Sequence, residues 1–150
     1  MFSARPGSRA RGRGMRLVGE WVYDARYDPP APVIDATLME PRRTNVSALV
    51  DSGADLTVVT EDKAKESSLT ERPPITVAFI RGPDYVGLAP IYRSKIRLRD
   101  TELLIALAVA PISEEAILGR DLLNRLIVSL NGPRRVISVF VSEESGQSKG

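Results

Sequence analysis

The sequence lacks two residue types on which many hydrolytic and metal-dependent enzymes rely. Its 150 residues include no cysteine and no histidine. The absence of cysteine excludes disulfides, thiol catalysis and thiolate metal sites. The absence of histidine excludes Ser-His and Cys-His catalysis and every metal site that needs an imidazole ligand. Carboxylate chemistry is the main enzymatic chemistry left, and we expect neither a metal nor another cofactor.

Aromatic residues and long apolar runs are also scarce. Phe, Trp and Tyr make up 5% of the chain, whereas hydrophobic residues make up 43%, so the core should be aliphatic. No segment approaches the roughly 20 apolar residues of a membrane-spanning helix. The N-terminal arginines are not followed by an apolar segment, so a secretory signal is not expected. These absences favour a cytoplasmic protein without a membrane partner, and the length suits one domain.

Basic charge is concentrated at the N-terminus. The formal net charge is +2, yet residues 1–16 hold five arginines and no acidic residue. This Arg- and Gly-rich segment cannot bury a core, so we predict a disordered tail there and a second one over the polar residues 142–150. Arginines neutralise phosphates, but no aromatic residues are interleaved with them to stack on bases. A solvated tail is therefore the favoured interpretation, and nucleic acid is an unlikely partner.

Short strands separated by turn residues dominate residues 17–141, which we predict to form one domain. Residues 33–39 alternate between apolar and polar side chains, as in a half-buried strand, whereas residues 103–109 are almost wholly apolar. Thr60 followed by Glu61 and Asp62 indicates a short helix capped by the threonine. A second short helix is predicted over residues 121–126. Further strands are predicted over residues 17–23, 46–50, 56–60, 75–80, 91–98, 116–118, 127–130 and 136–140.

One short segment combines a carboxylate with a tight turn. The segment Asp51-Ser52-Gly53-Ala54-Asp55 follows the apolar residues 48–50. Gly53 permits a sharp turn in which backbone N–H groups can approach the Asp51 carboxylate. A carboxylate placed at the end of a buried strand can activate water without a metal, thiol or imidazole. Because Asp-Ser-Gly alone is also a common turn composition, the catalytic interpretation needs a second segment.

That second segment is Ile117-Leu118-Gly119-Arg120-Asp121, an apolar strand ending in a glycine that can pack beside the first turn. In this order, the two segments resemble the signature of the retropepsin-like aspartic proteases, particularly the small cellular and prokaryotic members. The resemblance covers residues 46–139. It implies an all-β fold, a closed β-barrel equivalent to half of an acid protease. One or two short helices, a flap hairpin and a C-terminal hairpin would complete this fold.

The resemblance also implies roles for the residues of the first segment. Asp51 would be the catalytic aspartate, and Ser52, Gly53 and Ala54 would support its turn. The Ser52 hydroxyl is expected to hydrogen-bond to the same turn of a partner chain. Asp55 corresponds to a residue that often binds the substrate backbone in this family.

The second segment would hold the first in place. Arg120, beside Gly119, is expected to pair with Asp55. We favour a structural role for a buried pair of this kind, because removal of either partner would leave an unpaired charge. Asp121 could equally be the N-terminal cap of the helix that follows.

Residues 81–88 would form the tip of the flap that closes over the substrate. This tip is less rich in glycine than viral flaps, and it carries Pro83 and Asp84. The candidate flap residues are Gly82, Tyr85 and Gly87. Tyr85 could pack on the hairpin or contact the substrate. Candidate contributors to apolar subsites are Ile80, Leu88 and Ile112.

Pepsin-like enzymes carry two Asp-Thr/Ser-Gly motifs in one chain, and this chain carries one. The resemblance therefore implies a C2 homodimer in which each subunit supplies one Asp51. The resulting pair of aspartates would activate water to hydrolyse a polypeptide substrate. The C-terminal hairpin would either contribute to the subunit interface or only cover the core of its own subunit. The alternative function is a dimerisation or peptide-binding module with weak or no catalytic activity.

Overall fold

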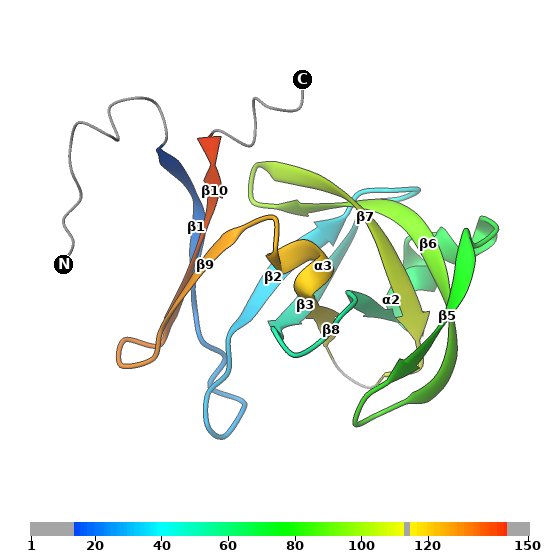
Figure 1. Ribbon diagram of the computed structural model, residues 1–150, viewed down its shortest axis with the longest axis horizontal. Coiled ribbons are helices and arrows are strands. Elements are labelled where there is room, and N and C mark those ends of the chain that lie inside the picture. The colour runs from blue at the N-terminus through cyan, green and yellow to red at the C-terminus, as the bar shows by residue number, and fades with distance from the viewer. Residues whose placement is uncertain (1–13, 113–114, 144–150) are drawn as a thin grey trace.

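The computed structural model describes residues 14–112 and 115–143, and these residues fold mostly into β-strands (Figure 1). This confirms the predicted fold class. Both predicted tails lie largely outside the described residues. The elements are β1 (Met15–Val22), β2 (Val33–Leu38), β3 (Thr44–Val50), β4 (Val58–Thr60), α2 (Glu61–Glu66), a 3-10 helix (Leu69–Glu71), β5 (Thr76–Arg81), β6 (Val86–Leu98), β7 (Thr101–Ala110), β8 (Ala116–Leu118), α3 (Arg120–Leu123), β9 (Ile127–Asn131) and β10 (Val136–Ser142).

Six strands close into a barrel in the order β2-β3-β8-β4-β7-β6. The barrel closes where β2 pairs with β6, at Leu38 and Ile96. β5 continues the sheet beyond β6 and forms the flap hairpin with it. β3 and β8 run parallel, with Val50 beside Leu118. Because parallel strands end at the same edge, the two signature segments that follow β3 and β8 meet at one end of the barrel.

Aliphatic side chains fill the barrel, as the composition predicts. Its largest fully buried residues include Leu38, Leu98, Leu107, Leu118 and Leu122. A smaller buried cluster is formed by Val58, Ala89, Ile91, Ala108 and Ala110. Ile80 and Tyr85 of the flap hairpin pack against this smaller cluster, so the hairpin is anchored through one of its faces.

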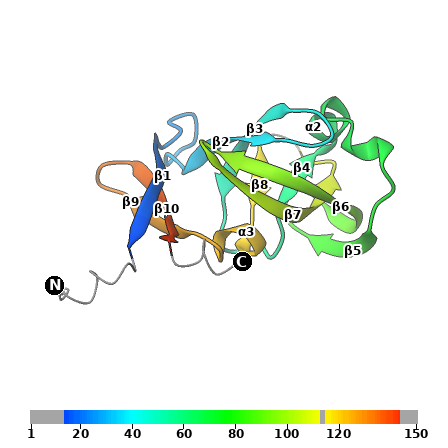
Figure 2. The same cartoon turned by 90° about the horizontal axis from the view of Figure 1, so that it is seen from above.

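A separate sheet of β1, β10 and β9 lies beside the barrel (Figure 2). Ile137 and Val139 of β10 are buried in the main core. The Trp21 indole N–H of β1 donates to an Asp35 carboxylate oxygen of β2 at 2.7 Å, and the Arg99 guanidinium lies 4.4 Å from the Trp21 ring. The C-terminal hairpin therefore covers part of the core of its own subunit.

Two boundaries differ from the prediction for reasons visible in the pairing. β1 begins at Met15, inside the predicted tail, because Met15 and Arg16 pair with Ser142 and Val141 of β10. β6 begins at Val86, five residues earlier than predicted, so the flap turn is shorter than the predicted tip. Among the described residues, no helix is long and apolar enough to span a membrane.

Candidate active site

Asp51 is the first residue after β3 and begins a turn over residues 51–55, which we call the aspartate turn. The backbone N–H of Asp51 donates to the Leu118 carbonyl at 3.1 Å, which ties the turn to the end of β8. The Gly53 N–H donates to Asp51 Oδ1 at 2.9 Å. A Cβ on Gly53 would lie 3.2 Å from the same oxygen, so the glycine leaves room for the carboxylate. The expected approach of a backbone N–H to the carboxylate is present.

Gly119 brings the second segment into direct contact with the aspartate turn. A Cβ at this position would lie 2.5 Å from the Leu56 carbonyl oxygen and 2.9 Å from that of Ala54. Both neighbours are backbone atoms, so any side chain at Gly119 would push the two segments apart. The Arg120 N–H also donates to the Ala54 carbonyl at 2.8 Å. The glycine packs beside the turn, as the sequence predicts.

Thr57 and Asp121 form hydrogen bonds at the same contact between the two segments. The Asp121 carboxylate accepts hydrogen bonds from the Thr57 hydroxyl at 2.8 Å and from the Thr57 backbone N–H at 3.1 Å. The Gly119 N–H donates to the same hydroxyl oxygen at 3.1 Å. The residue at the N-cap of α3 is Gly119, and Asp121 lies within the first turn, so the capping role considered for Asp121 is wrong.

Thr57 has no predicted role, because nothing in the sequence distinguishes it from the other residues of the predicted strand 56–60. In the structure it lies just before β4 and is fully buried. A buried hydroxyl needs hydrogen-bond partners, and the Thr57 hydroxyl donates to Asp121 and accepts from the Gly119 N–H. Its partner lies 64 positions away in the sequence, so the contact appears only once the barrel is closed.

Asp55 and Arg120 form the predicted ion pair, but the pair lies at the surface of the subunit. Arg120 Nη2 donates to Asp55 Oδ1, and Nη1 donates to the Ser52 carbonyl at 2.8 Å. The side chains of Asp55 and Arg120 are 81% and 45% exposed, so the expected burial is wrong for the single subunit. An exposed ion pair contributes only about 0–1 kcal/mol to stability. The contacts of Arg120 therefore fix the shape of the aspartate turn more than they stabilise the fold.

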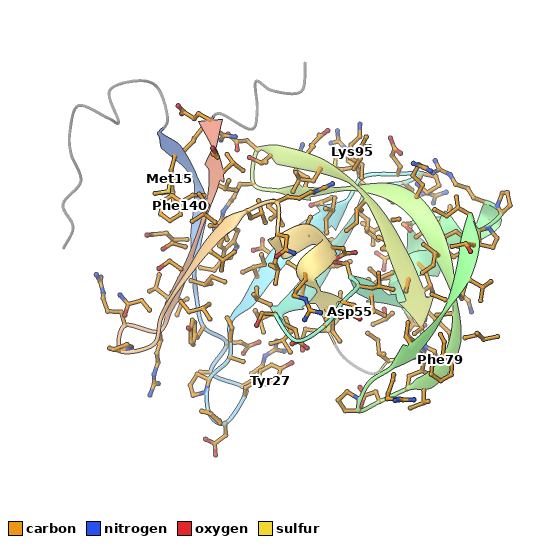
Figure 3. All side chains as sticks on the ribbon, in the orientation of Figure 1. Met15, Tyr27, Asp55, Phe79, Lys95 and Phe140 are labelled. Carbon is orange, nitrogen blue, oxygen red and sulfur yellow. The ribbon has the colours of Figure 1, made fainter. Side chains whose placement is uncertain are left out.

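A cleft of about 970 Å³ opens beside Asp51. Leu49 of β3 and Ile117 of β8 are paired neighbours and line it together with Asp51. The flap turn, residues 82–85, lines the cleft from the hairpin. Figure 3 shows Asp55 between Tyr27 on one side and Phe79 of the flap hairpin on the other, and all three line the cleft.

Two of the three predicted subsite residues, Ile80 and Ile112, line the cleft. Leu88 does not belong to the lining and is 65% exposed. Its prediction as a subsite residue is therefore wrong for the subunit described here.

Tyr85 both packs on the hairpin and lines the cleft. Its hydroxyl donates to the Leu88 carbonyl at 2.7 Å, and its own carbonyl accepts the Gly82 N–H at 2.8 Å, which closes the flap turn. Gly87 has a φ of +156°, and a Cβ there would lie 2.8 Å from the Tyr85 hydroxyl oxygen. Gly87 lies in β6 and not at the tip of the hairpin. Its missing side chain leaves room for Tyr85. Packing on the hairpin, one of the two roles considered for Tyr85, is present.

Tyr27 and Glu115 also line the cleft, although the sequence indicates no role for either. The Tyr27 hydroxyl donates to Glu115 Oε1, and Arg26 Nη2 lies 3.4 Å from Glu115 Oε2. Arg26 also donates to both carboxylate oxygens of Asp24. This side-chain hydrogen bond lowers the pKa of Asp24 to about 2. These residues come from loops distant in sequence, so no local pattern predicts their contact.

Comparison with known proteins supports the resemblance read from the signature. The family model described as retroviral aspartyl protease matches residues 30–131. A retropepsin-like aspartic protease from Rickettsia conorii superposes with a TM-score of 0.58 at 17% identity, over 86% of this chain and 95% of that one. The retroviral protease-like domain of Ddi1 from Leishmania major gives a TM-score of 0.53 at 21% identity, over 75% and 95% of the two chains.

At these identities, the two solved structures show a similar fold and no more. No curated protein matches the chain. The family model, in contrast, spans both signature segments and more than half of the chain. The chain therefore belongs to the retroviral aspartyl protease family.

Proposed function

We propose that this protein is an aspartic endopeptidase whose active site forms across a homodimer. The observation that carries the proposal is the Asp51 carboxylate, which accepts the Gly53 N–H and faces a cleft lined by the flap turn. The chain contains one Asp-Ser-Gly motif, so one subunit supplies one carboxylate of this kind. A twofold axis beside the aspartate turn would bring a second Asp51 to about 3 Å from the first.

The chemistry follows from the closeness of the two carboxyl groups. Two carboxylates at this distance cannot both ionise, so they share one proton and titrate as a pair. The ionised member takes a proton from a water molecule as the water oxygen attacks the peptide carbonyl carbon. The protonated member donates a hydrogen bond to the carbonyl oxygen. The C–N bond of the tetrahedral intermediate then breaks as the carboxyl group that took the proton from water gives it to the leaving nitrogen.

We assign the C-terminal hairpin to the subunit interface. β9 pairs with β10 on one side and is an outer strand of its sheet. Ile127 and Leu130 of β9 are 40% and 56% exposed. Outer strands with exposed apolar side chains readily pair with a strand from another chain. Their burial in a dimer would also add to the modest core of a chain of this size.

Cleavage of a diverse peptide mixture, read by mass spectrometry from pH 4 to pH 7, tests the proposal. The wild type should give products, and Asp51→Asn should give none while sedimenting as the same dimer. Asp62→Asn is the matched control, because Asp62 lies on α2 and outside the cleft lining. Products that persist in Asp51→Asn would refute the assignment of Asp51.

One observation favours a second function, a peptide-binding module with weak or no activity. The flap turn contains Pro83 and is closed by the Gly82–Tyr85 hydrogen bond, and the Tyr85 hydroxyl is held by the Leu88 carbonyl. Such a turn has fewer accessible conformations than a glycine-rich tip. A wild-type dimer that binds peptides and yields no products at any pH tested would support this function.

A further inference from the structure

Glu115 and Asp51 both line the cleft. Glu115 immediately precedes β8, and alternation along the strand places it on the same face as Ile117. Ile117 is paired with Leu49 of β3, and Leu49 stands two residues before Asp51 in the sequence. Along the strands, Asp51 and Glu115 are therefore about 13 Å apart, or four residue steps of about 3.3 Å each. The apolar side chains of Leu49 and Ile117 lie between them.

The charge of Glu115 is only weakly balanced by its neighbours. The Tyr27 hydroxyl donates to it but carries no charge. Arg26 Nη2 approaches Glu115 at 3.4 Å but lies 2.5 Å from Asp24 Oδ2, and Arg26 Nε donates to Asp24 as well. The three side chains of Asp24, Arg26 and Glu115 thus keep one net negative charge. Because the Arg26 side chain is 74% exposed, solvent screens its interaction with Glu115 further.

Burial makes this unbalanced charge significant for a ligand. The Glu115 side chain is 11% exposed. A charge in such a partly dehydrated place attracts an opposite charge more strongly than it would in bulk water. Two exposed carboxylates also line the cleft: Asp55 has Arg120 as its ion-pair partner, and Asp84 lies on the flap turn. Arg81, which contributes positive charge to the lining, lies on the flap hairpin and not on the β8 side.

We propose that Glu115 is a specificity-determining residue that selects substrates with a lysine or arginine near the scissile bond. The inference rests on the proposed function and names the substrate class of the same site. The aliphatic stem of such a side chain would pack on Leu49 and Ile117 while its charged head reaches the Glu115 carboxylate. In a homodimer, the second Glu115 lies on the other side of the scissile bond, so the preference applies on both sides.

Paired peptides that differ at one position test the inference. A cleaved peptide is resynthesised with Lys or Met at each position around the scissile bond, since Met has a similar length without the charge. At the position that faces Glu115, wild-type kcat/KM should be about tenfold higher for Lys than for Met, a ratio equal to ~1.4 kcal/mol. Glu115→Gln should bring this ratio close to one. Glu115→Lys should instead favour a peptide with Glu at this position over the same peptide with Gln.

A remote variant and a binding measurement complete the test. Glu102→Gln makes the same chemical change in a surface ion pair with Lys95, outside the cleft, and should keep the wild-type ratio. Binding of the same Lys and Met peptides to Asp51→Asn, followed by fluorescence anisotropy, reports the preference without any cleavage. A ratio near one in the wild type, or a ratio that survives Glu115→Gln, overturns the inference.

The two proposals fail in different ways. Absence of products from every peptide, combined with tighter binding of Lys peptides that Glu115→Gln abolishes, would refute the endopeptidase and support the role of Glu115. Products that show no preference for Lys or Arg at any position would leave the endopeptidase in place and refute the role of Glu115.

Discussion

A Cβ on Gly119 would lie 2.5 Å from the carbonyl oxygen of Leu56, a separation that real Cβ atoms do not reach. The two backbones touch because β3 and β8 end side by side and direct both signature segments to one edge of the barrel. The aspartate turn is therefore held by a backbone contact, and the side chains of Arg120 and Asp121 add hydrogen bonds around it.

Gly119→Ala should destabilise the fold and distort the aspartate turn. Forcing an extra methyl group into a packed contact costs typically about 1–3 kcal/mol. Urea unfolding should show this loss as a lower midpoint with an unchanged slope. Gly132→Ala is the matched control, because a Cβ at Gly132 meets nothing within 4 Å. Equal stability of the two variants would contradict the close contact.

Thr57→Val should be destabilising, although the side chain keeps its shape. The valine would leave the Gly119 N–H without its acceptor and remove one hydrogen bond from the Asp121 carboxylate. Unsatisfied buried polar groups cost about 1–3 kcal/mol each. Thr57→Ser should recover most of the loss in the free energy of unfolding. Thr37→Val, which removes a hydroxyl 3.3 Å from Asn45 at the surface, should cost little.

The Asp24–Arg26 pair should contribute to stability in a defined pH range. Its hydrogen bond lowers the pKa of Asp24 from 3.8 to about 2. A lowered pKa means that the folded state favours the ionised form, so the contribution is complete above about pH 4 and is lost as the pH falls through about 2. Asp24→Asn should flatten the dependence of the urea midpoint on pH between these values. An identical pH dependence in the variant would contradict the pairing.

Tyr27→Phe should weaken the preference for basic peptides without removing it. The variant loses the hydroxyl that donates to Glu115 Oε1 and so positions the carboxylate, but the charge stays. We expect KM for a Lys peptide to rise several-fold while kcat changes little, because the Tyr27 hydroxyl acts through Glu115, about 13 Å along the strands from Asp51. Tyr23→Phe is the control. It is preferred to Tyr92→Phe because Tyr92 is buried in the core, whereas Tyr23 is partly buried. A fall in kcat with constant KM would argue against a positioning role.

The features that the sequence predicts well are those with a local pattern. The strands around Asp51 and Gly119 follow from their apolar residues, and the helix cap at Thr60 follows from the residues beside it. The resemblance of the two segments to the retropepsin-like signature predicts the contact between them. The ion pair of Asp55 and Arg120 follows from the same resemblance.

The features that the sequence does not predict depend on how the closed barrel places distant segments. The exposure of Asp55 depends on which surface surrounds the turn, and the absence of Leu88 from the cleft lining depends on how the flap hairpin is placed against the barrel. The contact of Tyr27 with Glu115 joins two loops 88 positions apart. No periodicity or turn signal in either loop indicates the other, so their position in the cleft emerges only from the fold.

The most direct test of the shared active site is to mix wild-type subunits with Asp51→Asn subunits and follow peptide cleavage. After the subunits exchange, a mixed dimer contains one Asp51 carboxylate and cannot form the pair. The account predicts that activity falls as the square of the wild-type fraction at constant total protein. Activity that falls in direct proportion to the wild-type fraction would show that each subunit works alone and would contradict the account.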